Sequence, residues 1–131
     1  MSSSDTNAPS IRAISIRGAD WKHDKFNRNS PTANFVKWSK ALEIHLSLLG
    51  LKFYAFGPLV RTPSDTAEPV AYQNWVANDD LTKAVILTAL DETEYEGVDN
   101  APSAAKLYAL VKARAEGEGP VCMVTLIQEV L

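Results

Sequence analysis

The chain has 131 residues, a length that accommodates one domain with a tail and allows well over half of the unfolded surface to be buried. A formal net charge of −3 with 46% hydrophobic residues gives no general attraction to nucleic acid or to an anionic membrane. The single cysteine, Cys122, excludes a disulfide or a thiolate zinc site formed within this chain. There is no apolar signal-peptide core and no segment of roughly 18 apolar residues, so we expect a cytoplasmic protein without membrane contact.

Residues 1–33 are predicted to form a flexible N-terminal arm. Residues 1–34 hold five basic and three acidic residues (+2), whereas the other 97 hold eight basic and thirteen acidic residues (−5). Residues 1–10 are polar and rich in serine, and the alternation over 11–16 indicates a short strand that ends at Gly18. Residues 19–33 are expected to be a loop that pins the isolated aromatics Trp21 and Phe26 on the domain.

Residues 34–49 form the helix around which the domain is predicted to be organised. Asn34 is a suitable N-cap, because its side-chain oxygen can accept from a backbone N–H of the first turn. Gly50 can end the helix in the left-handed conformation, and Leu51 can then fold back onto Leu46.

The apolar residues of this helix cover an arc of roughly 200° at 100° per residue. The principal face is centred on Trp38, Leu42 and Leu46, while Ala41, Ile44 and Leu48 widen it. An arc this wide predicts a helix that is packed on two sides. His45 lies on the arc, where a lone histidine indicates a core or interface residue.

The next segments are predicted from proline, glycine and charge. Residues 57–69 contain three prolines and are expected to be a mobile loop, followed by a helix over about 69–90. We favour one long helix, although Asn78, Asp79 and Asp80 could also cap a second one. Residues 91–99 are acidic and indicate a solvated face with a short helical turn broken at Gly97.

Two more helices complete the predicted all-α domain of 34–131, a small bundle of about four to five helices. One begins near Asn100 with Pro102 at an early position and ends at residues 117–120, where Gly117, Gly119 and Pro120 interrupt the pattern. The other begins at Pro120 and is still apolar at the last residue, which predicts either that the domain continues beyond it or that this end docks on another surface.

Residue patterns for catalysis or metal binding are absent from the sequence. The two histidines form no His-x-x-x-His or Glu-x-x-His pair, and Gly-x-Ser-x-Gly and P-loop motifs are missing. Asp79 and Asp80 point about 100° apart on a helix, which favours a capping or solvated role over a paired-carboxylate site. We therefore expect a protein without enzymatic activity, cofactor or metal.

The spacing of the anchors resembles the Gag polyprotein of copia-type LTR retrotransposons. That family opens with an Asn-aromatic-x-x-Trp motif that leads into a helix ending near Gly-Leu. The matching residues here are Asn34, Phe35 and Trp38, then Leu42-Glu43-Ile44, Leu46 and Leu49-Gly50-Leu51. Later matches are Trp75, Asp79 or Asp80, Ala84, Ile86 and Leu90, then Ala104-Ala105, Leu107, Tyr108 (near the position of a family Trp), Leu110 and the pair Val124 and Leu126.

The resemblance covers about residues 34–131 and implies a fold like the N-terminal lobe of a capsid. It implies a structural protein that self-associates into virus-like particles around the element's RNA, or the same fold reused by a host as a binding module for a peptide or partner helix. The sequence departs from the family by an insertion between Gly18 and Asn34 and by the absence of a zinc knuckle. RNA contact is therefore expected only through regions outside this chain or weakly through the basic arm.

Two residue sets follow for this domain. The expected core is Phe35, Trp38, Leu42, Leu46, Leu49, Trp75, Ile86, Leu90, Leu107 and Leu110. The possible interface is Ile44, Leu48, Val124, Ile127 and Leu131, because contiguous apolar surface that one small domain does not cover marks an interface. Packing of the terminal helix on Ile44 and Leu48 within one chain is the open alternative.

Overall fold

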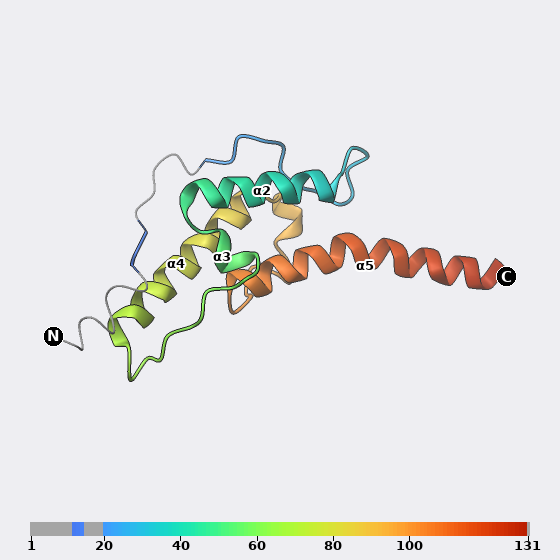
Figure 1. Ribbon diagram of the computed structural model, residues 1–131. Helices are drawn as coiled ribbons and strands as arrows, with labels where there is room; N and C mark the ends of the chain where they lie inside the picture. The colour runs from blue at the N-terminus through green and yellow to red at the C-terminus, as the bar shows by residue number, and fades with distance from the viewer. Residues whose placement is uncertain (1–11, 15–19, 131) are drawn as a thin grey trace.

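A computed structural model describes residues 12–14 and 20–130 of the chain, with side chains as far as Gly117. The described part is all-α, and it contains no named strand (Figure 1). Its elements, in chain order, are α2 (Phe35–Leu49), α3 (Lys52–Ala55), α4 (Pro69–Thr88), the 3-10 helix η1 (Glu92–Glu94) and α5 (Ala104–Val130).

Helix α2 begins and ends where the sequence predicts. The side chain of Asn34 accepts a hydrogen bond from the backbone N–H of Lys37 at 3.0 Å. Gly50 has φ 79°, and the N–H of Leu51 donates to the carbonyl of Leu46 at 2.8 Å, which is the long bond of a Schellman end. This end turns the chain sharply into α3.

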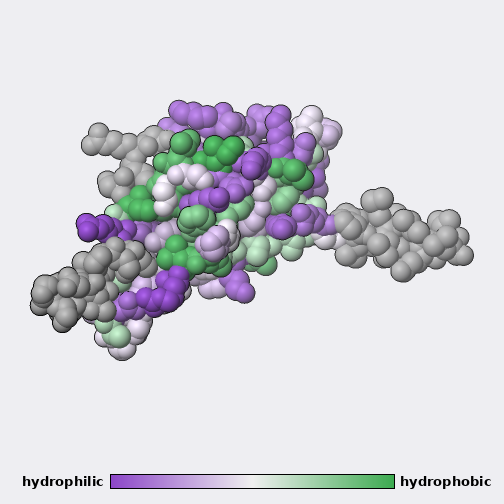
Figure 2. Space-filling model, in the orientation of Figure 1, coloured by the Kyte–Doolittle hydropathy of each residue, from purple (hydrophilic) through white to green (hydrophobic). Residues whose placement is uncertain are grey.

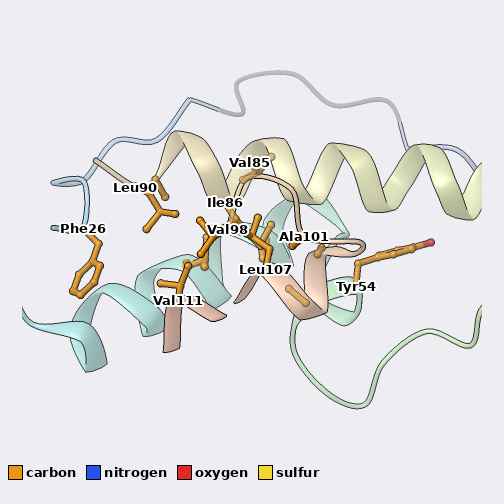
Figure 3. Packing of buried hydrophobic residues seen from close by; sticks show 14 of the residues in the cluster. Phe26, Tyr54, Val85, Ile86, Leu90, Val98, Ala101, Leu107 and Val111 are labelled. Carbon is orange, nitrogen blue, oxygen red and sulfur yellow. The ribbon is translucent and has the colours of Figure 1, made fainter. Parts of the chain in front are cut away.

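The core lies where α2, α4 and the first turns of α5 meet. Three side chains lie side by side at its centre: Ile86 from α4, Val98 from the segment before α5, and Leu107 from α5 (Figure 3). Each is at most 1% exposed. Phe26 and Tyr54 lie at opposite ends of the cluster in that view. Of the expected core residues, six are buried and Phe35, Leu49 and Trp75 are partly buried against the cluster; the six are Trp38, Leu42, Leu46, Ile86, Leu90 and Leu107.

The assignment of Leu110 to the core is wrong, since its side chain is 41% exposed. The buried stripe of α5 is centred on Ala104, Leu107 and Val111, which are all at most 2% exposed. At 100° per residue, Leu110 lies roughly 90° around the helix from the centre of this stripe.

Helix α4 is continuous from Pro69 to Thr88, with Pro69 in its first turn. Asn78 and Asp79 neither cap a second helix nor face solvent, because their exposed fractions are 1% and 3%. Thr82 is also buried, and its hydroxyl donates to the Asn78 carbonyl at 2.7 Å. Helix α4 therefore buries a row of polar side chains, which other segments contact.

The loop between α3 and α4 is more ordered than its composition suggests. Pro63 is buried, and the N–H of Val60 donates to the carbonyl of Phe53 at 2.9 Å. Glu68 pairs with Arg61 at 2.9 Å and accepts from the N–H of Ser64 at 3.2 Å. The predicted loop is confirmed and is closed by these hydrogen bonds, while its mobility stays a prediction.

Helix α5 also differs from the prediction. It runs from Ala104 to Val130 as one element, so the expected break at residues 117–120 and the separate terminal helix are absent. Its first turn has two polar contacts: Ser103 Oγ accepts from the N–H of Lys106, and Asp79 Oδ1 accepts from the N–H of Ala104. Capping therefore comes partly from another helix.

The described part of the expected arm is integral to the bundle. Phe26 is 5% exposed, its N–H donates to the Ala89 carbonyl at 3.0 Å, and its carbonyl accepts from the N–H of Asp91 at 2.9 Å. These two bonds form a parallel bridge-type pair with the segment that follows α4. The expected packing of Trp21 and Phe26 on the domain is thus confirmed, and residues 20–33 are not a detached arm. Residues 12–14 form no strand, and the rest of 1–33 lies outside the described residues.

Candidate interaction surfaces

The solvent side of α2 carries a row of exposed apolar side chains. Val36, Ile44 and Leu48 are 77%, 52% and 82% exposed, and Lys40 lies between them at the same four-residue spacing. We call Val36, Lys40, Ile44 and Leu48 the outer row. Each step of four residues advances about 40° around a helix, so the row forms one continuous ridge.

The side of α2 that carries Ile44 and Leu48 is expected from the sequence to be packed. None of the residues that the structure describes with side chains covers it. Hydrophobic patches between hydrophilic ones are visible on the face of the molecule in Figure 2. Of the possible interface residues, Ile44 and Leu48 are exposed, whereas the side chains of Val124, Ile127 and Leu131 lie outside the described part. The structure consequently leaves Ile44 and Leu48 available for contact.

A cleft of about 470 Å³ lies between residues 21–34 and the first half of α2. Trp21 and Trp38 line it, with their ring centroids 6.4 Å apart, and Lys25 and Lys37 lie at its edge. His45 packs edge-on against Trp21 at 5.5 Å between centroids. This histidine thus belongs to an aromatic contact between α2 and the preceding segment, in agreement with a packing role.

Glu94 is the buried carboxylate of the acidic segment. It is 3% exposed, accepts from the backbone N–H of Arg28 at 2.9 Å, and lies 3.7 Å from Arg28 Nε and 3.8 Å from Arg114 Nη1. Arg114 also donates to the carbonyls of Glu94 and Glu96. The expectation that residues 91–99 form only a solvated face is wrong at Glu94, which ties the N-terminal segment to α5.

Asp79 is the second buried carboxylate, and its partner is a helix terminus. Burial raises the pKa of Asp79, and the Ala104 N–H bond at 2.9 Å and the charge of Lys83 only partly offset this effect. Asp80, next to it, is exposed and pairs with Lys83 at 3.4 Å. The two carboxylates therefore act separately and form no paired acid–base site.

Asp79→Asn is expected to leave the free energy of unfolding near pH 7 unchanged or higher, because the amide oxygen can accept the same bond without a desolvated charge. A raised folded-state pKa contributes stability that is fully present below the unfolded value of about 3.9 and is lost as the pH rises through the folded value. Urea unfolding from about pH 4 to pH 7 should show wild type losing stability relative to the variant. Asp80→Asn, at an exposed position, is the matched control. If the free energy of unfolding of the wild type rises relative to that of Asp79→Asn over this pH range, the assignment is contradicted.

Asn78 holds residues 12–14 against α4 through both ends of its amide. Oδ1 accepts from the N–H of Ile14 at 2.8 Å, and Nδ2 donates to the carbonyl of Arg12 at 2.7 Å. Nδ2 also donates to the Tyr54 hydroxyl at 2.9 Å, which fixes the amide orientation. A fully buried amide is thus used to bind the backbone of a segment 64 residues away in the chain.

Sequence reasoning missed the roles of Asn78 and Glu94, and it expected Phe26 to pack on the domain without identifying its partner. Asn78 had a signal, since it lies on the same stripe of α4 as Ala71, Thr82 and Val85, at heptad-like spacing. Phe26 had only its aromatic character, and Glu94 had no periodic signal because it lies in a short 3-10 turn. Both depend on contacts between segments far apart in the chain.

Among residues 12–14 and 20–117, whose side chains the structure describes, no group of three or more histidine, cysteine, aspartate or glutamate side chains could hold a metal ion. In the same part of the chain, no helix combines the length and apolar character needed to cross a membrane. No protein-family model, curated protein or solved structure matches the sequence or the fold.

Proposed function

We propose that this protein is a non-enzymatic structural protein, the capsid lobe of a copia-type retrotransposon Gag, which self-associates into virus-like particles that package the element's RNA. The spacing of the anchor residues, which resembles that of copia-type Gag, supports the assignment to this family. The anchors have structural roles that such a resemblance requires: Asn34 caps α2, Trp38 is buried, and Gly50 ends α2 with a positive φ. In this proposal RNA contact comes from regions outside the chain or weakly from the basic arm.

The observation that carries the assembly role is the exposed outer row of α2. Ile44 and Leu48 are neighbouring exposed apolar side chains on one ridge of a 15-residue helix, with Val36 beyond Lys40 on the same ridge, and exposed contiguous apolar surface typically marks an interface. Lys40 within the row and Glu43 beside it add one positive and one negative group. Under a two-fold axis across α2, such a pair is self-complementary, because Lys40 of each copy can approach Glu43 of the other.

Leu48→Glu is expected to weaken self-association by about tenfold or more, equivalent to at least about 1.4 kcal/mol, because it places a charge in the contact. The helical circular dichroism and the melting temperature should stay near wild type, since Leu48 is 82% exposed. Size-exclusion chromatography with light scattering over a concentration series measures the first effect. A dissociation constant that is unchanged by the substitution contradicts the proposal.

Val70→Glu is the matched control. Val70 is 51% exposed near the start of α4, so the substitution adds the same charge to exposed apolar surface away from the outer row. It should leave both the association and the melting temperature unchanged. Equal effects of Leu48→Glu and Val70→Glu would show that added charge, rather than the outer row, controls association.

A second candidate function is a host-adopted binding module that takes a peptide between helices. The observation that favours it is separate from the outer row: Asn78, oriented by its bond to the Tyr54 hydroxyl, already holds residues 12–14 of this chain through their backbone.

A further inference from the structure

The side-chain amide of Asn78 makes the hydrogen bonds that the backbone of a neighbouring β-strand would make. In a parallel ladder, one residue donates its N–H to the carbonyl of residue i−1 on the partner and accepts from the N–H of residue i+1. Asn78 makes this pair of bonds with Arg12 and Ile14, at 2.7 and 2.8 Å. Both bonds go to backbone atoms. They therefore recognise an extended conformation and do not select among the side chains that the segment carries.

The side chain of Ile14 supplies the specificity that the amide lacks. Ile14 packs against the core cluster, and its Cδ1 lies 3.7 Å from where a Cβ at Gly50 would be. The aliphatic side chain therefore lies over the glycine that ends α2, where no side chain competes for the space. Arg12 and Ala13 are exposed, so only one of the three residues is anchored.

Asn78 and Tyr54 both come from helices of the bundle, so the site is supported by elements outside the segment that fills it. Asn78 is 1% exposed, and Tyr54, whose hydroxyl accepts from its Nδ2, is 8% exposed. On loss of the segment, the amide would keep the Tyr54 bond, and Oδ1 would lose the Ile14 N–H. The site therefore offers a backbone donor and acceptor to an incoming segment.

We propose that Asn78 is the centre of a peptide-binding site for an extended segment with one aliphatic side chain, which residues 12–14 fill within the chain and which the same segment of a second copy fills in exchange. The second copy is the occupant because its residues 12–14 have the backbone and the isoleucine that the site already holds. The intramolecular segment competes at an effective concentration of the order of millimolar, so exchange requires that it be weakened or outnumbered. This proposal deepens the second candidate function and does not depend on the outer row.

The test uses the full chain and a fluorescein-labelled peptide of residues 10–17. Ile14→Asp in the chain should remove the intramolecular competitor, since aspartate cannot occupy the apolar position, while Asn78 and Tyr54 remain. Fluorescence anisotropy should then give an apparent dissociation constant for the peptide at least about tenfold lower than with wild type. Absence of binding to the Ile14→Asp chain, with its helical circular dichroism intact, overturns the proposal.

A backbone modification of the peptide tests the Asn78 bond without altering the protein. N-methylation of the residue 14 amide removes the hydrogen that Asn78 Oδ1 accepts. N-methylation of the residue 13 amide is the control, because successive amides of an extended segment point to opposite sides. The first peptide should bind at least about tenfold more weakly than the second, and equal binding of the two overturns the proposal.

The same titration in a chain with both Ile14→Asp and Leu48→Glu separates the two proposals. Peptide binding should be unchanged there even where self-association through the outer row is lost. Loss of peptide binding on Leu48→Glu would show that the peptide binds the outer row, and it would overturn the Asn78 site.

Discussion

Trp38→Ala is expected to lower the free energy of unfolding by about 3–5 kcal/mol, the range for deleting a large aromatic side chain from a core. Trp38 is 6% exposed, and its ring lies 5.3 Å from that of Phe26 and 5.7 Å from that of Phe35 between centroids. Its Nε1 also donates to the Ala89 carbonyl at 2.9 Å, the same carbonyl that accepts from the Phe26 N–H. The substitution removes packing and a hydrogen bond at the point where three segments meet.

Domains of this size commonly have a total stability of only about 5–15 kcal/mol, so little folded protein should remain at elevated temperature. Urea or thermal unfolding followed by circular dichroism measures the loss. Trp75→Ala deletes the same side chain from a position that is only partly buried and is expected to cost less. A Trp38→Ala variant at least as stable as Trp75→Ala contradicts the central place of α2 in the core.

Glu94→Ala should have the second-largest effect on stability, about 2–3 kcal/mol, because it leaves two partly buried guanidinium groups and a backbone N–H without their carboxylate. The expected cost is below that of breaking a fully buried pair, since the side chains of Arg28 and Arg114 are 27% and 25% exposed and the distances are 3.7 and 3.8 Å. The variant should also loosen residues 27–30 from the bundle.

Glu94→Gln is the matched control for the charge. Its amide oxygen can still accept from the Arg28 N–H, so it should retain part of the stability that Glu94→Ala loses. Denaturant unfolding gives the free energies, and amide hydrogen exchange at Arg28 reports the local contact. Unchanged exchange at Arg28 in Glu94→Ala would show that Glu94 does not hold this segment.

The all-α architecture and the limits of α2 and α4 could be predicted because the information is local. Asn34 and Gly50 have conformational preferences that act within one helical turn, and the apolar spacing of α2 identifies its buried face without tertiary knowledge. The exposure of Ile44 and Leu48 is not fixed in this way, since the wide apolar arc predicts packing on two sides and leaves open whether the terminal helix covers them. Their use as an interface stays a prediction.

The remaining features depend on contacts that no local pattern encodes. Phe26 is buried because backbone groups of Ala89 and Asp91 are positioned to pair with it, and a lone aromatic in a polar segment does not reveal that partner. The N-terminus of α5 is capped by Asp79, which is 25 residues earlier in the chain. The continuity of α5 past Gly117 opposes local propensity, and nothing in the described side chains explains it.

Sedimentation equilibrium of the wild-type chain tests the assembly role most directly. Self-association through the outer row predicts an average mass that rises with concentration between about 10 μM and 1 mM, and Leu48→Glu should return it to that of the monomer. Val70→Glu should follow the wild type. A mass that stays at the 14.3 kDa of one chain at all concentrations would contradict self-association of this chain through α2.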